Sequence, residues 1–211
     1  MWNNRKRLGR LFIVSGSSGS GKTTLLERVS QKREFPRNMT KIITVTTRAA
    51  RNAEKNGRDY YFVDREEFFR RRKRGEFAEF QEIYGDYYAT PKRDLLRVLA
   101  AGNDALLCVD VKGALTLKRI FPKNAVLIFI AVPDFKSLKE RLACRSSETR
   151  ESLRKRLRIV KDELQCATRY DYVIINDMLS QAVKKLSAII TAERLRVGNR
   201  DACSLLNSKK G

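Results

Sequence analysis

The sequence contains no histidine, and its four cysteines never fall in a Cys-x-x-Cys pair. Because protein zinc sites are built from closely spaced cysteines and histidines, these absences argue against a zinc protein. Long apolar runs are missing too: the longest, at 125–132, falls far short of the roughly 20 residues that a membrane span requires. The apolar stretch behind the basic N-terminal segment, LFIV, is too short for the core of a signal peptide.

The cysteines, at positions 108, 144, 166 and 203, show no pattern of a disulfide framework. Their spacing predicts free thiols in a reducing compartment, the cytoplasm. Cys108 stands in an apolar run, where a free cysteine behaves as a small buried hydrophobe. No internal repeat or low-complexity linker divides the 211 residues, so we expect one domain.

Charge of one sign is scarce: 24 Asp and Glu stand against 45 Lys and Arg, which gives a formal net charge of +21. A balance this basic favours polyanionic partners such as nucleotides, nucleic acid or a membrane surface. The plainer alternative is a general bias toward basic surfaces, because the charge is spread along the whole chain. With 42% hydrophobic residues, the chain is still apolar enough to fold.

Four uninterrupted apolar runs, 11–14, 105–109, 125–132 and 172–175, are typical of strands covered on both faces. Stretches with apolar residues three and four positions apart separate them and predict helices. Strand–helix alternation of this kind predicts an α/β fold, a parallel sheet flanked by helices.

Two regions interrupt the alternation. Residues 36–91 are rich in Thr, Tyr, Phe and Arg, with strand-like pieces and one charged helix at 64–75, and residues 136–169 are helical and dense in arginine. We interpret both as insertions on a core of about 10–35, 92–135 and 170–196. The tail after about residue 197 is expected to fray.

Residues 16–23 read GSSGSGKT and match G-x-x-x-x-G-K-[ST] in full, between an apolar strand and a helical pattern. Glycines let successive backbone N–H groups turn inward as an anion nest, and the start of the following helix adds its positive end. We expect Lys22 to reach the β- and γ-phosphates of ATP and Thr23 to bind Mg²⁺ through its hydroxyl. The ATP-binding residues predicted here are Gly16, Ser17, Ser18, Gly19, Ser20, Gly21, Lys22, Thr23 and Thr24.

Two further stretches, TVTTRAARNAEKNGRDYY at 44–61 and EFAEFQEIYGDYYAT at 76–90, resemble the guanylate kinase family when taken with the phosphate loop. The resemblance runs from about residue 10 to 196. It implies a P-loop kinase fold with a mixed α/β GMP-binding insertion at 36–91 and a helical lid at 136–169. By the resemblance, Arg48 and Arg51 grip the 5′-phosphate of GMP, a role that suits two planar guanidinium forks. By the same resemblance Thr44, Tyr60 and Tyr88 donate hydroxyl hydrogen bonds to that phosphate, and Glu54 orients one of the two guanidiniums.

Selection of guanine, by the same resemblance, depends on Glu79 and Thr90. Guanine presents adjacent N1–H and N2–H₂ donors, which one carboxylate can accept together, whereas adenine presents a bare acceptor at N1. Buried polar pairing of this kind discriminates strongly between substrates. The alternative is that Glu79 is a surface residue on an amphipathic strand.

The strand at 105–109 leads into Asp110, which matches the second aspartate of the family's D-x-D-x-x-G pattern. By that match Asp110 holds Mg²⁺ through water or touches the guanine amino group. The first aspartate is replaced by Cys108, the clearest departure from the family. Ala50 and Ala53 also stand where the family usually has proline and glycine.

The stretch RLACRSSETRESLRKRL at 141–157 matches the family's lid, with Ser146 in place of its usual glycine. Arg141, Arg145 and Arg156 then close over the phosphates, offset charge on the transferred group and exclude water. Asn176, after the last strand, is implied to hold the adenine of ATP; a polar pair capping the final helix explains it equally well.

The sequence therefore predicts a kinase that phosphorylates GMP from ATP with Mg²⁺, with catalytic residues Lys22, Arg48, Arg141, Arg145 and Arg156. Three alternatives stay open: a catalytically silent binding module of the kind found in scaffold proteins, a nucleic-acid-binding protein, and a P-loop kinase for another phosphorylated acceptor such as a ribose bisphosphate. The intact phosphate loop argues against the first, and Glu79 with Thr90 argues against the last. The basic clusters at 5–7 and 70–74 lack interleaved aromatic residues, so only weak, salt-sensitive binding to polyanions is expected. No pattern predicts a membrane partner or an oligomeric state.

Overall fold

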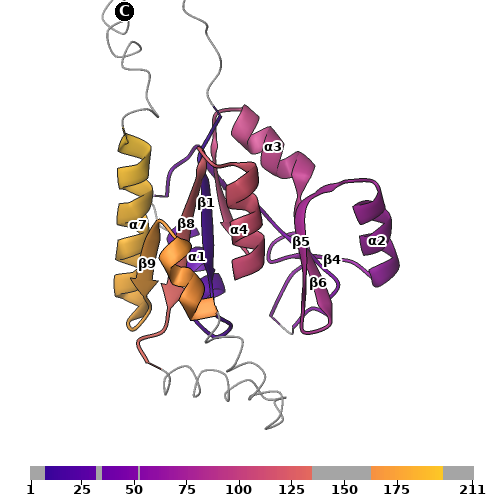
Figure 1. The fold of residues 1–211 in the computed structure, drawn as a ribbon, viewed down its shortest axis with the longest axis horizontal. Helices are drawn as coiled ribbons and strands as arrows, with labels where there is room; N and C mark the ends of the chain where they lie inside the picture. The colour runs from indigo at the N-terminus through magenta and orange to yellow at the C-terminus, as the bar shows by residue number, and fades with distance from the viewer. Residues whose placement is uncertain (1–7, 32–34, 52, 135–162, 197–211) are drawn as a thin grey trace, which may run out of the picture.

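A parallel sheet in the order β2-β7-β1-β8-β9 lies at the centre of the computed structural model, which describes residues 8–31, 35–51, 53–134 and 163–196 (Figure 1). Its strands are β1 (Leu11–Gly16), β2 (Met39–Lys41), β7 (Asp104–Cys108), β8 (Ala125–Ala131) and β9 (Tyr172–Ile175). Every pairing between them is parallel. The apolar runs correctly predicted four of these strands. The fifth, β2, was missed because its sequence is MTK, short and half polar.

Helices cover both faces of the sheet, which confirms the predicted α/β fold. The side chains of β1 alternate, so Phe12 and Val14 face one layer while Leu11 and Ile13 face the other. The first layer contains α1 (Lys22–Ser30) and α7 (Leu179–Leu195), and the second contains α3 (Lys92–Ala100) and α4 (Val111–Ile120). Figure 1 shows α7 and α4 on opposite sides of the strands. A short 3₁₀ helix, η1 (Cys166–Arg169), precedes β9.

A second, smaller sheet in the order β4-β3-β6-β5 lies beyond α4, on the side away from α7 (Figure 1). It consists of β3 (Val45–Thr46), β4 (Tyr61–Phe62), β5 (Phe77–Ile83) and β6 (Asp86–Pro91), covered by α2 (Arg65–Lys73). Phe68 of α2 is fully buried, with its ring 4.9 Å from that of Phe77 and 5.4 Å from that of Tyr87. The charged helix predicted at 64–75 is therefore present, anchored by one apolar side chain. Asp64 begins it by accepting a hydrogen bond from the Glu67 amide.

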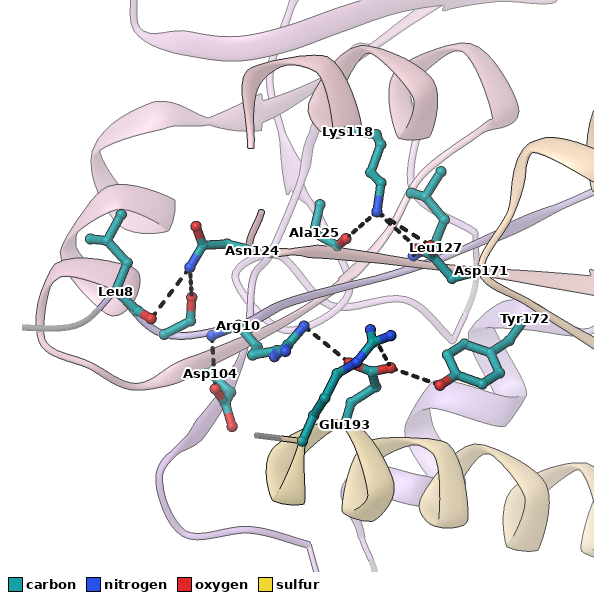
Figure 2. A network of polar contacts seen from close by, with 12 residues as sticks. Leu8, Arg10, Asp104, Lys118, Asn124, Ala125, Leu127, Asp171, Tyr172 and Glu193 are labelled. Carbon is teal, nitrogen blue, oxygen red and sulfur yellow. Dashed lines mark hydrogen bonds and ion pairs between the residues drawn. The ribbon is translucent and has the colours of Figure 1, made fainter. Parts of the chain in front are cut away.

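The amino ends of the central strands are tied together by buried polar contacts (Figure 2). Glu193 of α7 is 3% exposed, pairs with Arg10 at 3.0 Å and accepts a 2.7 Å hydrogen bond from the Tyr172 hydroxyl. Asp104 accepts a hydrogen bond from the Arg10 amide at 2.8 Å (Figure 2). It also pairs with Arg194 at 2.9 Å. These contacts join β1, β7, β9 and the last turn of α7 at one edge of the sheet.

The candidate active site lies at the opposite, carboxyl ends of the central strands. Because β1 and β7 are parallel neighbours, the loops that follow them emerge side by side at their carboxyl ends, where open α/β sheets bind ligands. The phosphate loop follows β1, and Asp110 follows β7. None of the helices in the described ranges is both long and apolar enough to cross a lipid bilayer.

Candidate active site

The phosphate loop leaves β1 at Gly16, where the backbone turns sharply. Gly16 has φ +140°, and a Cβ atom there would overlap the carbonyl oxygen of Ile130 on the neighbouring strand. Gly21, with φ +85°, precedes the first turn of α1, and a Cβ there would lie 2.5 Å from the Asn176 side-chain nitrogen. Both positions therefore require glycine for backbone conformation and for close packing.

Asn176 holds the phosphate loop by a hydrogen bond to its backbone. Its buried amide nitrogen donates a 2.7 Å hydrogen bond to the Ser20 carbonyl, which links the end of β9 to the phosphate loop. The N-cap residue of α7 is Met178, which makes no side-chain cap hydrogen bond. The structure thus shows Asn176 holding the shape of the loop.

Lys22 folds back over the loop that it follows. Its Nζ donates hydrogen bonds to the carbonyls of Gly16 at 2.6 Å and Ser17 at 2.8 Å. The ammonium group is thereby fixed beside the backbone that would hold phosphates, at the amino end of α1. Thr23 and Thr24, in the first turn of the helix, are exposed to solvent.

A second basic group lies at the small sheet. Arg48 follows β3, and one of its terminal nitrogens donates to both carboxylate oxygens of Glu54, at 2.8 and 2.9 Å. The Arg48 guanidinium also lies 5.5 Å from the centre of the Tyr60 ring. Glu54 accepts a further hydrogen bond from the Arg51 amide at 2.9 Å, so one carboxylate shapes the whole turn. The contact between Glu54 and a guanidinium expected from the sequence is therefore made by Arg48.

The other residues assigned to the acceptor phosphate surround Arg48. The Tyr60 ring packs edge-on against that of Tyr88, with centroids 6.1 Å apart. Burial raises the pKa of Tyr60, so its hydroxyl remains a hydrogen-bond donor across the physiological range. Thr44 is buried just before β3, whereas the Arg51 side chain is exposed. Arg48, Tyr60, Tyr88 and Thr44 thus share one end of the small sheet, with Arg51 at its rim.

Glu79 is a buried residue, not the surface glutamate of the alternative interpretation. It is 6% exposed and lies opposite Thr90 in the pairing of β5 with β6. The Thr90 hydroxyl, itself fully buried, donates a 2.6 Å hydrogen bond to Glu79 Oε1. The pKa of Glu79 is raised to about 7, mainly by burial and also by the nearby Asp110 carboxylate, while the Thr90 hydrogen bonds oppose the change.

Asp110 is the N-cap of α4. One carboxylate oxygen accepts from the Gly113 amide at 3.0 Å and the other from the Lys112 amide at 3.2 Å. Gly113 in turn lies against Glu79, because a Cβ atom there would be 2.7 Å from Glu79 Oε2. The start of α4 therefore connects Asp110 to Glu79, which sequence reasoning did not anticipate.

Cys108 ends β7 and is partly buried against the core, less enclosed than the sequence predicts. Cys108 also lines a pocket that contains residues of the predicted ATP site and of the predicted GMP site. The other lining residues are Thr23, Leu26, Lys41, Ile42, Thr44, Asp59 and Tyr60. Burial raises the pKa of the Cys108 thiol, although Lys22 and Lys41 oppose the shift, so the thiol is neutral at physiological pH.

The donor set suits a magnesium ion that arrives with a nucleotide. Mg²⁺ takes oxygen ligands and keeps several waters, and the exposed Thr23 hydroxyl offers one such oxygen. Within the described ranges, no three His, Cys, Asp or Glu side chains gather into a metal-binding group. The neutral Cys108 thiol is a poor ligand for a hard cation. The residues therefore fit an ion held mainly by phosphate and water.

Glu163 is a site residue that sequence reasoning missed. It is half-buried beside Lys22 and Asp110; burial raises its pKa to about 7, the Lys22 charge lowers it and the Asp110 charge raises it. In the sequence it is one charged residue in a helical stretch, without any motif of its own. The predicted lid arginines Arg141, Arg145 and Arg156 lie outside the described residues.

Comparison with known proteins agrees with this geometry. The guanylate kinase family model matches residues 8–193. A guanylate kinase of Thermus thermophilus is 42% identical over 190 residues, covering 90% of this chain and 84% of that protein. One of Clostridium tetani is 37% identical over 203 residues, covering 96% and 95%.

Solved structures give the same result. The crystal structure of a guanylate kinase from Anaplasma phagocytophilum superposes with a TM-score of 0.79 at 31% identity, covering 97% of this chain and 96% of that one. A shikimate kinase from Bacteroides thetaiotaomicron is similar in fold alone, with a TM-score of 0.51 at 16% identity over 86% of this chain and 98% of that one.

Proposed function

The chain belongs to the guanylate kinase family, and from that premise we propose how its own residues carry out the family's reaction. The activity is that of a nucleoside monophosphate kinase, which transfers the γ-phosphoryl of ATP to GMP and gives ADP and GDP. Since phosphoryl transfer involves little covalent chemistry by the protein, the residues act by alignment and by charge.

On the donor side, residues 16–24 bind the ATP phosphates through backbone N–H groups. Lys22 releases its two carbonyl acceptors, Gly16 and Ser17, to contact the β- and γ-phosphates. Asn176 keeps the loop in shape by holding the Ser20 carbonyl, and it borders the adenine. When bound, Mg²⁺ supplies positive charge at the phosphate oxygens; Thr23 would hold it directly and Asp110 through water.

On the acceptor side, Arg48 and Arg51 bind the 5′-phosphate of GMP, with hydroxyls from Thr44, Tyr60 and Tyr88. Glu54 fixes the Arg48 guanidinium by two hydrogen bonds, so the group is oriented before GMP arrives. Arg141, Arg145 and Arg156 complete the positive surroundings of the transferred group.

The observation that carries the choice of GMP is the buried Glu79–Thr90 pair. A buried carboxylate that accepts a 2.6 Å hydrogen bond from the Thr90 hydroxyl can accept both donors of guanine. The same carboxylate would meet a lone pair on adenine. Free thiols at Cys108 and Cys166 support the proposal that the enzyme works in the cytoplasm.

A substrate panel tests the proposal. Purified protein is given Mg-ATP with GMP, deoxy-GMP, AMP, CMP or UMP, and ADP release is followed by a coupled assay. We expect turnover with GMP at least about 100-fold above AMP, in keeping with discrimination by buried polar pairing. Equal rates on AMP and GMP would remove Glu79 from its role, and no turnover on any nucleotide would refute the function.

A further inference from the structure

Lys41 lies where the donor and acceptor sites meet. It is the last residue of β2, half-buried, and it lines the same pocket as Thr23 on the donor side and Thr44 and Tyr60 on the acceptor side. No motif or family pattern considered above assigns Lys41 any role. Its position nevertheless puts a cation between the two groups of residues that bind phosphates.

The charge of Lys41 is not balanced by an ion pair in the part of the chain that the structure describes. The hydrogen bond made by its ammonium group is a long one, 3.4 Å, to the Arg58 carbonyl. Asp59 lies nearby and also lines the pocket, but its carboxylate is engaged by Arg58 at 2.8 Å and by the Lys55 amide at 2.8 Å. Lys41 is therefore available to an anion.

The residue of β7 that lines this pocket is a cysteine and not a carboxylate. Cys108 lines the same pocket and lies near both Lys22 and Lys41, but its thiol is neutral. An aspartate in that place would draw the ammonium group toward β7. With a thiol there, the ammonium group has no anionic competitor on that side of the pocket.

A cation here has a physical purpose. Donor and acceptor phosphates must approach although both are negative, and charge spreads over the transferred group between them. Preorganised positive charge aimed at that position stabilises the transition state more than the separate ground states. In the proposed function Lys22 serves the donor and Arg48 the acceptor, and Lys41 lines the pocket that Thr23 of the donor side shares with Thr44 and Tyr60 of the acceptor side.

We propose that Lys41 binds a phosphate oxygen at the junction of the two nucleotide sites, as a third cation for the transfer. The proposal rests on the proposed function of the site. It adds to that site a lysine whose ammonium group the neutral Cys108 thiol does not engage.

The test compares Lys41→Met, which keeps the aliphatic stem and removes the charge, with Lys41→Arg. Lys184→Met, an exposed lysine of α7, is the matched control. We expect Lys41→Met to lower kcat/KM for GMP about 10- to 100-fold, the range seen when one charge-stabilising group is lost, with recovery of most of the activity in Lys41→Arg. Lys184→Met should behave as the wild type, and melting curves confirm that all variants fold.

Binding of inorganic pyrophosphate, measured by calorimetry, provides a readout that does not need turnover. Its affinity should fall about tenfold in Lys41→Met and not in Lys184→Met. If the wild type phosphorylates GMP and Lys41→Met retains both its rate and its pyrophosphate affinity, Lys41 is a solvated surface lysine and the inference is wrong. If the wild type phosphorylates nothing while pyrophosphate affinity still falls in Lys41→Met, the function fails and the anion site stands.

Discussion

Among single residues, Glu79 has the most unusual environment for its chemistry. In the role proposed for it, the Glu79 carboxyl must be ionised to accept two donors from guanine, yet burial raises its pKa to about 7. The Glu79 carboxyl therefore titrates within the physiological pH range, where an exposed glutamate is fully ionised. Two consequences follow, one for activity and one for stability.

Activity toward GMP should depend on pH through Glu79. Below about pH 7 the carboxyl is protonated in the free enzyme, so kcat/KM for GMP should fall about tenfold for each further pH unit. In Glu79→Gln the activity is lower throughout and this limb of the pH profile is absent. Glu82→Gln, an exposed position on the same strand, should retain the wild-type profile. A wild-type profile that is flat from pH 8 to pH 5 would contradict the assignment.

Stability should change in the opposite sense. A carboxyl whose pKa is raised on folding, from 4.5 to about 7, stabilises the folded state most when protonated. That stability is present below about pH 4.5 and is lost as the pH rises through 7. Urea unfolding should therefore show Glu79→Gln gaining stability over the wild type between pH 5 and pH 8, with no such trend in Glu82→Gln. A constant difference across this range would mean that Glu79 ionises at an ordinary pKa.

The sequence predicted these residues unevenly. Arg48, Glu54, Glu79 and Thr90 could be selected because each belongs to a stretch that resembles the guanylate kinase family. Glu163 and Lys41 could not, because their significance depends on which elements the fold brings beside them. In a sequence, a charged residue outside any motif is expected to be solvent-exposed. Only the fold shows which residues lie beside it.

Among the elements, the first turn of α4 deserves a functional interpretation beyond its cap. Asp110 holds the amides of Lys112 and Gly113, and the missing side chain of Gly113 lets Glu79 Oε2 approach the helix. The start of α4 therefore packs closely against the Glu79 carboxylate, which we propose binds guanine, while the Thr90 hydroxyl holds the other carboxylate oxygen by a hydrogen bond. Glycine within a helix normally costs stability relative to alanine, so its presence here indicates a packing requirement.

Replacement of Gly113 by alanine tests this arrangement. A Cβ atom would meet Glu79 Oε2 at 2.7 Å and Asp110 Oδ1 at 2.9 Å, so the carboxylate must move. We expect KM for GMP to rise about tenfold or more while KM for ATP stays near its wild-type value. Adding Glu79→Asp, one methylene shorter, should recover part of the loss. If Gly113→Ala binds GMP normally, the close packing has no role in recognition.

Element prediction was good for strands and weaker at their margins. The apolar runs gave β1, β7, β8 and β9, because buried parallel strands need apolar side chains on both faces. Strand β2 lies at the edge of the sheet and pairs with β7 alone. Its sequence, MTK, is not an apolar run. Only its pairing with β7 places Lys41 in the central sheet and beside the pocket.

For the whole molecule, the outstanding property is the net charge of +21. The basic cluster at 70–74 has no aromatic residues interleaved in the sequence, but the fold brings aromatic rings beside it. The Arg72 guanidinium lies 4.2 Å from the centre of the Phe80 ring, contributed by β5, and 5.9 Å from that of Phe69, and both rings are more than a third exposed. Arginine and exposed aromatic rings together are typical of surfaces that contact single-stranded nucleic acid.

We therefore expect weak association with single-stranded RNA that coexists with catalysis. Fluorescence anisotropy with a labelled oligonucleotide should show affinity falling steeply between 50 and 200 mM salt, as roughly expected for phosphate contacts. Arg72→Ala should weaken the binding at each salt concentration without altering GMP kinase activity. Affinity that is independent of salt would exclude a charge-driven association.

The buried carboxylate of Glu193 ties the first described strand to the last helix, and this has a consequence for synthesis on the ribosome. Arg10 is translated well before its partner Glu193, because the two residues lie far apart in the sequence. Until Glu193 is translated, the ion pair between Arg10 and Glu193 cannot form. Strand β1 also pairs with β7 and β8, which are translated later. Nascent chains that stop before this glutamate should be captured by chaperones or degraded, so partial products would not accumulate as stable fragments.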